Sequence, residues 1–119
     1  MLGEENNELA LLFACAGGSN VGQLANEVGK ALTMEGKGKL FCLAGIGGQV
    51  EGIVRTAKEA NKVIAIDGCS VRCARKTLEK AGIVVQLHTV LTEVGFEKNS
   101  NLSVSDEEIA KAKMYIESF

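Results

Sequence analysis

Short apolar runs alternate along the chain with longer segments in which apolar residues recur every three or four positions. The short runs are typical of β-strands and the longer segments of amphipathic helices. Strand-like runs lie at residues 8–16, 39–46, 62–68 and 83–91, and helix-like segments at 21–36, 49–61, 70–82 and 105–119. The pattern therefore predicts a strand followed by a helix, repeated four times.

The composition of the four runs predicts how the strands pair. The first three are nearly unbroken aliphatic stretches, as expected when helices cover both faces of a parallel sheet. The fourth has Gln86, His88 and Thr92 between its apolar residues, which indicates an edge strand. We expect an α/β, Rossmann-like or flavodoxin-like three-layer sandwich, whose four-stranded, mainly parallel sheet has the order 2-1-3-4 and helices on both faces. With 119 residues, 46% of them hydrophobic, the chain has the length of one domain, residues 1–119.

Local signals predict where two of the helices begin. The third helix is expected to begin at about Ser70, with Cys69 as its cap and Gly82 beyond its end. The last helix is preceded by an S-x-x-E capping box made by Ser105 and Glu108. This last helix should cover one face of the sheet.

Four cysteines, Cys15, Cys42, Cys69 and Cys73, lie near the ends of the first three predicted strands. The glycine-rich turns CAGGSN, AGIGGQ and DGCS follow these strands, at the carboxyl edge where such sheets bind ligands. Cys73 lies one helical turn after Cys69, which would bring their Cβ atoms to roughly 5–6 Å. We therefore expect the four thiols to converge, although Cys42 could instead lie inside its strand and point into the core.

Four thiolates suit a soft or borderline metal ion, and zinc is commonly held by four cysteine sulfurs. Asp67, two residues before Cys69, is placed to orient a ligand, to be the fourth ligand itself if Cys42 lies in the core, or to stabilise the start of the helix. Arg72 is placed to offset the negative charge of metal-bound thiolates. The pattern thus predicts a binding or metal-handling module with a cysteine-ligated metal site, most simply zinc, and assigns no catalytic activity.

The charge and the N-terminus narrow the function classes. A formal net charge of −2 gives no basic face for nucleic acid. The N-terminal apolar run is too short to cross a bilayer and has no basic residues before it, so we expect no membrane contact and a cytoplasmic location. In a reducing compartment, four cysteines are ligands or reactive thiols rather than disulfides. The sequence leaves open the protein partner and the oligomeric state, a homo-oligomer included.

Three segments together resemble the DGC-domain family, a family of proposed zinc-binding proteins. They are CAGGSNVGQLANEVGKAL, LFCLAGIGG and AIDGCSVRCARKTLEKAG, and the resemblance extends from about Leu11 to Lys98. It implies that all four cysteines are zinc ligands, and it names no reaction.

Other cysteine chemistries remain open. An iron–sulfur cluster would use the same four ligands. A thiol enzyme would use Cys69 for redox or sulfur-transfer chemistry. Cys69 and Arg75 also have the C-x5-R spacing of cysteine phosphatases and arsenate reductases, but such a loop would occupy residues 70–74 and leave a helix of only about six residues.

The remaining polar features predict no chemistry. His88 is expected on an exposed strand face, and the polar loop at residues 95–103 contains no catalytic pattern. GGSNVG matches neither a P-loop nor G-x-G-x-x-G, so its glycines more simply allow close packing around the cysteines.

Overall fold

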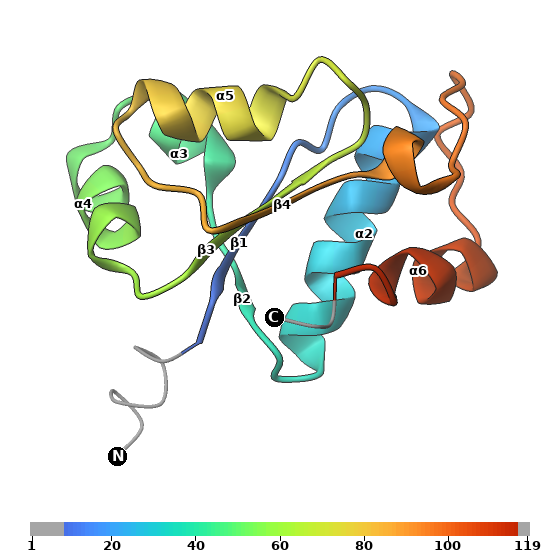
Figure 1. Cartoon of the computed structure of the whole chain (residues 1–119), viewed down its shortest axis with the longest axis horizontal. Helices are drawn as coiled ribbons and strands as arrows, with labels where there is room; N and C mark the ends of the chain where they lie inside the picture. The colour runs from blue at the N-terminus through green and yellow to red at the C-terminus, as the bar shows by residue number, and fades with distance from the viewer. Residues whose placement is uncertain (1–8, 117–119) are drawn as a thin grey trace.

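A computed structural model of the chain describes residues 9–116, and Figure 1 shows how its helices and strands are arranged. In chain order they are β1 (Leu11–Ala14), α2 (Asn20–Met34), β2 (Lys39–Leu40), α3 (Leu43–Gly47), α4 (Glu51–Glu59), β3 (Val63–Asp67), α5 (Cys73–Lys80), β4 (Leu87–Val90), the 3-10 helix η1 (Leu91–Val94) and α6 (Asp106–Lys113). Within residues 9–116, no helix combines the length and the apolar character needed to cross a bilayer.

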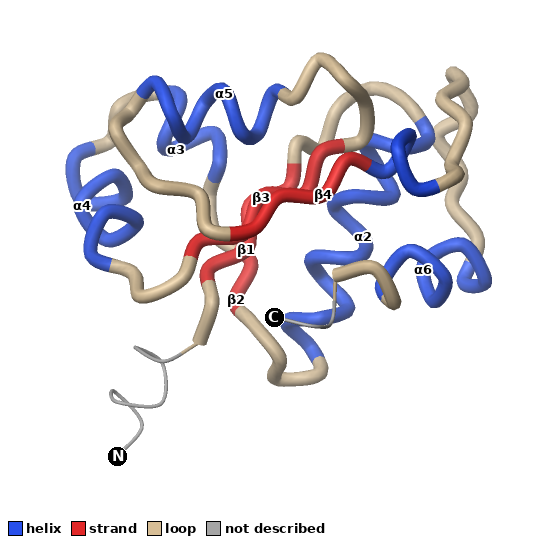
Figure 2. The backbone as a smooth tube through the Cα atoms, in the orientation of Figure 1, coloured by secondary structure: helices blue, strands red, loops and turns tan. Residues whose placement is uncertain are grey.

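The four strands form one parallel sheet in the order β2-β1-β3-β4 (Figure 2). The central strands β1 and β3 are buried along their whole length, with Phe13 opposite Ala65 in register. β4 lies at the edge beside β3. The predicted strand order and parallel arrangement are therefore confirmed.

Helices pack on both faces of the sheet because side chains of each strand alternate between the faces. On one face, Leu12 and Ile64 pack with residues of α2 and α6. On the other, Phe13 and Ala65 pack with residues of α3, α4 and α5. Figure 1 shows the two groups of helices on opposite sides of the strands. The predicted three-layer arrangement is confirmed.

The second strand is much shorter than predicted. It covers only Lys39–Leu40, and the glycine-rich LAGIG segment forms α3 instead. Helical spacing brings Ile46 into the core, where it is buried. Gly45 allows α3 to lie against α4, because a Cβ at this position would collide with the Ile53 side chain. Tertiary packing therefore ends the strand before Cys42.

The last helix begins where the capping box predicts. The Ser105 hydroxyl accepts a hydrogen bond from the Glu108 N–H at 3.1 Å, and the Glu108 carboxylate accepts one from the Ser105 N–H at 3.0 Å. The helix ends at Lys113, earlier than predicted, and residues 117–119 of the predicted segment lie outside the described residues.

Candidate functional site

Three of the four cysteines line one pocket at the carboxyl edge of the sheet. The pocket has a volume of about 220 Å³ and lies between the loop after β1, the start of α2 and the loop joining β3 to α5. Its wall contains Cys15, Cys69 and Cys73. We call it the thiol pocket; its other lining residues are Gly17, Gly18, Ser19, Gly22, Gly68, Val71 and Lys98.

Two glycines allow the three backbones around the thiol pocket to meet. A Cβ on Gly68 would lie 2.7 Å from the carbonyl carbon of Val21, in the first turn of α2. A Cβ on Gly22 would lie 2.5 Å from the carbonyl oxygen of Gly17. Backbone atoms cannot move aside as a flexible side chain can, so these contacts require glycine. The close-packing role predicted for the glycine-rich turns therefore applies to these two positions.

Cys15 is half-buried in the wall of the thiol pocket. Its sulfur accepts a hydrogen bond from the Gly68 N–H at 3.3 Å. Burial raises the pKa of the Cys15 thiol, and the nearby charges of Asp67 and Cys73 act in the same direction. The N–H groups of Gly17 and Gly68 partly oppose that rise. Cys15 is therefore held as a neutral thiol more strongly than an exposed cysteine would be.

The third helix begins three residues later than predicted. The prediction of a start at about Ser70 is wrong: residues 69–72 form a turn, closed by a 3.1 Å hydrogen bond from the Arg72 N–H to the Cys69 carbonyl oxygen, and α5 begins at Cys73. Arg72 has the left-handed conformation, with φ of 61°. Cys69 is thus in a turn rather than at a helix cap, and Cys73 is the first residue of the helix.

Asp67 explains why the helix begins where it does. Its carboxylate accepts hydrogen bonds from the N–H groups of Ala74 at 2.7 Å and Arg75 at 3.1 Å, which are free donors of the first turn of α5. The side chain is 1% exposed. Its negative charge also interacts favourably with the N-terminal end of the helix. Of the three roles predicted for Asp67, this geometry matches stabilisation of the helix start.

The His88 side chain is mostly covered beside Asp67, contrary to the prediction of an exposed strand face. Its Nε2 atom lies 2.8 Å from an Asp67 carboxylate oxygen, and its side chain is only 8% exposed. Its Nδ1 atom lies 3.3 Å from the Arg75 guanidinium. His88 pairs with Ala65, whose side chain faces the helices α3, α4 and α5, and α5 therefore covers it. The register of β4 against β3 is the signal that could have placed His88 on this face of the sheet.

The two arginines of this segment are engaged away from the thiol pocket. The Arg72 guanidinium donates to Glu93 at 2.8 Å, so its charge is balanced by a carboxylate. The Arg75 guanidinium donates to Glu79 at 2.8 Å. In a C-x5-R phosphatase loop, the arginine would instead hold an oxyanion beside the nucleophilic cysteine. The late helix start does provide a turn after Cys69, but Arg75 does not face that turn.

Cys42 does not share the thiol pocket with the other three cysteines. It is the exposed N-cap residue of α3 and is absent from the lining of the thiol pocket. The alternative in which Cys42 points into the core is wrong, because the strand ends before it. No group of three or more His, Cys, Asp or Glu side chains within residues 9–116 is arranged to hold a metal ion. The soft donors suit zinc, but the predicted four-cysteine shell is not assembled in this arrangement, and zinc ligation stays a prediction.

The loop at residues 95–103 contributes to the thiol pocket, although its sequence predicts no chemistry. The Lys98 ammonium donates to the Cys69 sulfur at 3.5 Å and lines the pocket. A lone lysine in a polar loop gives no sequence signal for such a role, since the contact joins segments 29 residues apart.

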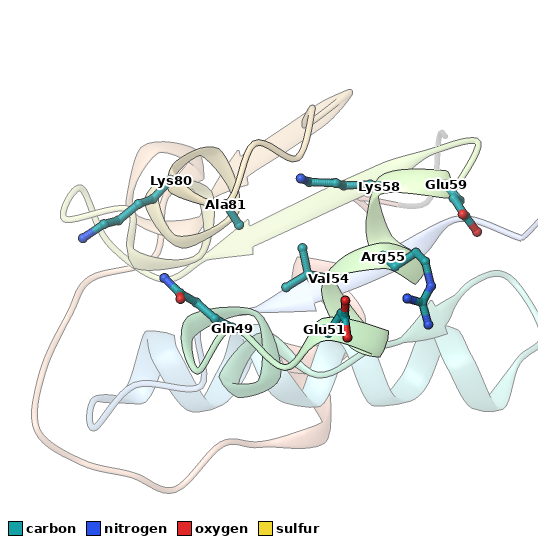
Figure 3. Close-up of a pocket in the computed structure, with 8 residues that line it drawn as sticks. All are labelled: Gln49, Glu51, Val54, Arg55, Lys58, Glu59, Lys80 and Ala81. Atoms are coloured by element: carbon teal, nitrogen blue, oxygen red, sulfur yellow. The ribbon is translucent and has the colours of Figure 1, made fainter.

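A larger hollow, of about 730 Å³, lies between α4 and the end of α5 (Figure 3). Figure 3 shows Val54 and Ala81 among charged side chains of both signs. Its lining residues are Gln49, Glu51, Val54, Arg55, Lys58, Glu59, Lys80 and Ala81. It contains no cysteine or histidine and is separate from the thiol pocket.

The fold and the pocket define a class of protein: a parallel α/β sheet with a cysteine-lined pocket at its carboxyl edge. The profile of the DGC domain matches residues 11–116, and the chain belongs to the DGC-domain family. The chain is similar to the "Anaerobic and virulence modulator AnvM" of Pseudomonas aeruginosa, with 38% identity over 93 residues, which cover 78% of this chain and 71% of that protein. No solved structure matches the chain.

Proposed function

We propose that the chain is a thiol-based binding module in which Cys15, Cys69 and Cys73 bind a thiophilic metal ion, zinc first among them. The observation that supports the proposal is that these three thiols line one small pocket. Thiolate sulfur is a preferred donor for zinc, and three protein ligands with one open position are a known arrangement for this ion. Among the residues that the structure describes, no three His, Cys, Asp or Glu side chains are placed to hold an ion, so the proposal requires the sulfurs to move closer together when the ion binds.

The test is elemental analysis combined with a thiol count, on protein purified without oxygen. We expect one zinc ion per chain and three protected thiols, with Cys42 still free to react. Zinc should be retained in Cys42→Ser and lost in Cys69→Ser and Cys73→Ser. Chelation should lower the melting temperature of the wild type, since bound metal stabilises the folded state.

Three other outcomes each have a clear meaning. Four protected thiols with zinc would add Cys42 to the ligands, as the family resemblance implies. Brown protein containing iron and sulfide would replace zinc with an iron–sulfur cluster. Absence of metal with four freely reacting thiols would refute the proposal.

A second candidate function is thiol chemistry at Cys69, in redox reactions or sulfur transfer. The observation that favours it is the Lys98 ammonium beside the Cys69 sulfur, because a neighbouring cation supports a reactive thiolate. In metal-free protein, Cys69 should then be alkylated faster than Cys42. Equal rates at the two cysteines would exclude this candidate.

The name of the relative suggests a setting for either chemistry. AnvM is called an anaerobic and virulence modulator. Free thiols and metal–thiolate bonds are both lost on oxidation, so a thiol pocket is sensitive to oxygen. We extend to this chain only the general role of a modulator, and we propose the cytoplasm, where thiols are kept reduced, as its compartment.

A further inference from the structure

One segment of the polar loop, Glu97–Asn99, lies across the start of α2 and is held there by Asn20. The Asn20 side chain donates to the Glu97 carbonyl oxygen at 2.7 Å and accepts from the Asn99 N–H at 2.6 Å. The Asn20 N–H donates to the Asn99 carbonyl oxygen at 3.1 Å. We call residues 97–99 the strap. One asparagine thus binds the strap on both sides of Lys98.

The rest of the loop is ordered by its own asparagines. The Asn99 side chain accepts from the Asn101 N–H at 2.8 Å, and the Asn101 side chain accepts from the Ser103 N–H at 3.0 Å. These two hydrogen bonds form turns that lead from the strap toward Ser105, the residue that caps α6. The strap therefore has a defined path, and Lys98 has a defined position.

Lys98 supplies the charge of the thiol pocket. Of the described residues that line the pocket, Lys98 alone has a charged side chain. The carboxylate of Asp67 lies nearby but is buried and bound to the start of α5 and to His88. The Arg72 guanidinium is bound to Glu93. A ligand entering the pocket therefore meets thiols, backbone and one positive charge.

We propose that Lys98, fastened by Asn20, makes the thiol pocket select small anions that bind or react with thiols over neutral molecules of the same shape. The inference rests on the proposed function in that it takes the thiol pocket as the working site, but it requires no metal. Lys98 acts as a specificity-determining residue, and Asn20 is a positioning residue that acts through it. The ligand class is a small carboxylate, or a similar anion, that binds beside Cys69 or has an electrophilic carbon. In the second case the Cys69 sulfur attacks that carbon, a C–S bond forms, and the leaving group departs with the electron pair of the bond that breaks.

The test compares two alkylating agents of nearly equal size, anionic iodoacetate and neutral iodoacetamide, on reduced full-length protein freed of metal. Rates at Cys69 and Cys42 are measured separately by mass spectrometry of the peptides. The measured quantity is the iodoacetate-to-iodoacetamide rate ratio at Cys69, and Cys42 is an internal reference away from the strap.

In Lys98→Gln, the ratio at Cys69 should fall about three- to five-fold, the size expected for one unit charge a few ångströms away in water-like surroundings. Lys98→Arg retains the positive charge, so its ratio at Cys69 should stay close to that of the wild type. Asn20→Ala should lower the ratio as well, because the strap is released. In 1 M salt, the wild-type ratio should fall toward that of Lys98→Gln, since screening acts over about 3 Å at this concentration. Lys30→Gln is the matched control and should change nothing, because Lys30 pairs with Glu27 on the exposed side of α2.

An unchanged ratio at Cys69 in Lys98→Gln would overturn the proposal, as would an equal fall at Cys42. A normal ratio in folded Asn20→Ala, with folding verified by circular dichroism, would overturn the positioning role of Asn20. The result is independent of the zinc experiment, because a protein that binds no zinc can still show the charge selection, and a zinc-binding protein can lack it.

Discussion

Replacement of Asp67 by Ala would remove the carboxylate that stabilises the first turn of α5 and would leave its donors without a partner. Two backbone N–H groups and the His88 ring contact this carboxylate, which is almost completely buried. The Ala74 N–H is buried, so its loss of an acceptor carries the full desolvation penalty of about 1–3 kcal/mol. The Arg75 N–H is partly buried, so water can replace some of its lost bond.

Together with the lost contact to His88, these changes should lower the free energy of unfolding by about 3–5 kcal/mol in Asp67→Ala. Asp67→Asn keeps one carbonyl oxygen for one N–H group and loses the charge, so we expect about 1–2 kcal/mol. If Asp67→Ala does not fold, Asp67→Asn carries the measurement.

The assay is urea-induced unfolding followed by circular dichroism, and the m value is held at that of the wild type when the curves are fitted. Asp106→Ala is the matched control, because Asp106 is an exposed aspartate in the first turn of α6. Its effect through the helix dipole should stay under about 1 kcal/mol. The reasoning is refuted if Asp67→Ala and Asp106→Ala cost the same.

Two further predictions concern the backbone and the thiol of the pocket. Gly68→Ala should destabilise the fold by about 1–3 kcal/mol, because the new Cβ meets the backbone of α2. Gly18→Ala is the control and should be nearly neutral, because a Cβ there meets nothing within 4 Å. Equal effects of the two substitutions in chemical denaturation would contradict the close-packing role of Gly68. Burial raises the pKa of Cys15 above its ordinary value of 9.0, so the folded protein holds this proton more tightly than the unfolded chain. The free energy of unfolding should therefore decrease as the pH rises above about 9.0, and this decrease should be smaller in Cys15→Ala. If the variant has the same pH dependence of unfolding as the wild type, the raised pKa of Cys15 is not its cause.

Much of the fold could be predicted because it depends on short-range pattern and on general topology. The alternation of apolar runs and amphipathic segments is sufficient to predict the order of strands and helices along the chain. The right-handed connection between parallel strands then restricts the order of the strands within the sheet. The capping box lies within four residues, so the start of α6 is also local information. The same rules bring Cys15, Cys69 and Cys73 to one edge, because each follows or begins an element at that edge.

Only the tertiary structure determined the polar contacts between segments that are distant along the chain. α5 begins at Cys73 because Asp67 of β3 binds its first turn, and Cys42 is exposed because packing of Ile46 and Gly45 turns its segment into a helix. Lys98 lies beside Cys69 in a strap that Asn20, far away along the chain, binds. Periodicity and propensity describe neighbours along the chain, and a hydrogen bond across 79 residues leaves no such pattern. The sequence alone therefore predicted where the cysteines gather, and the folded chain determined which of them share a pocket and which charge they meet there.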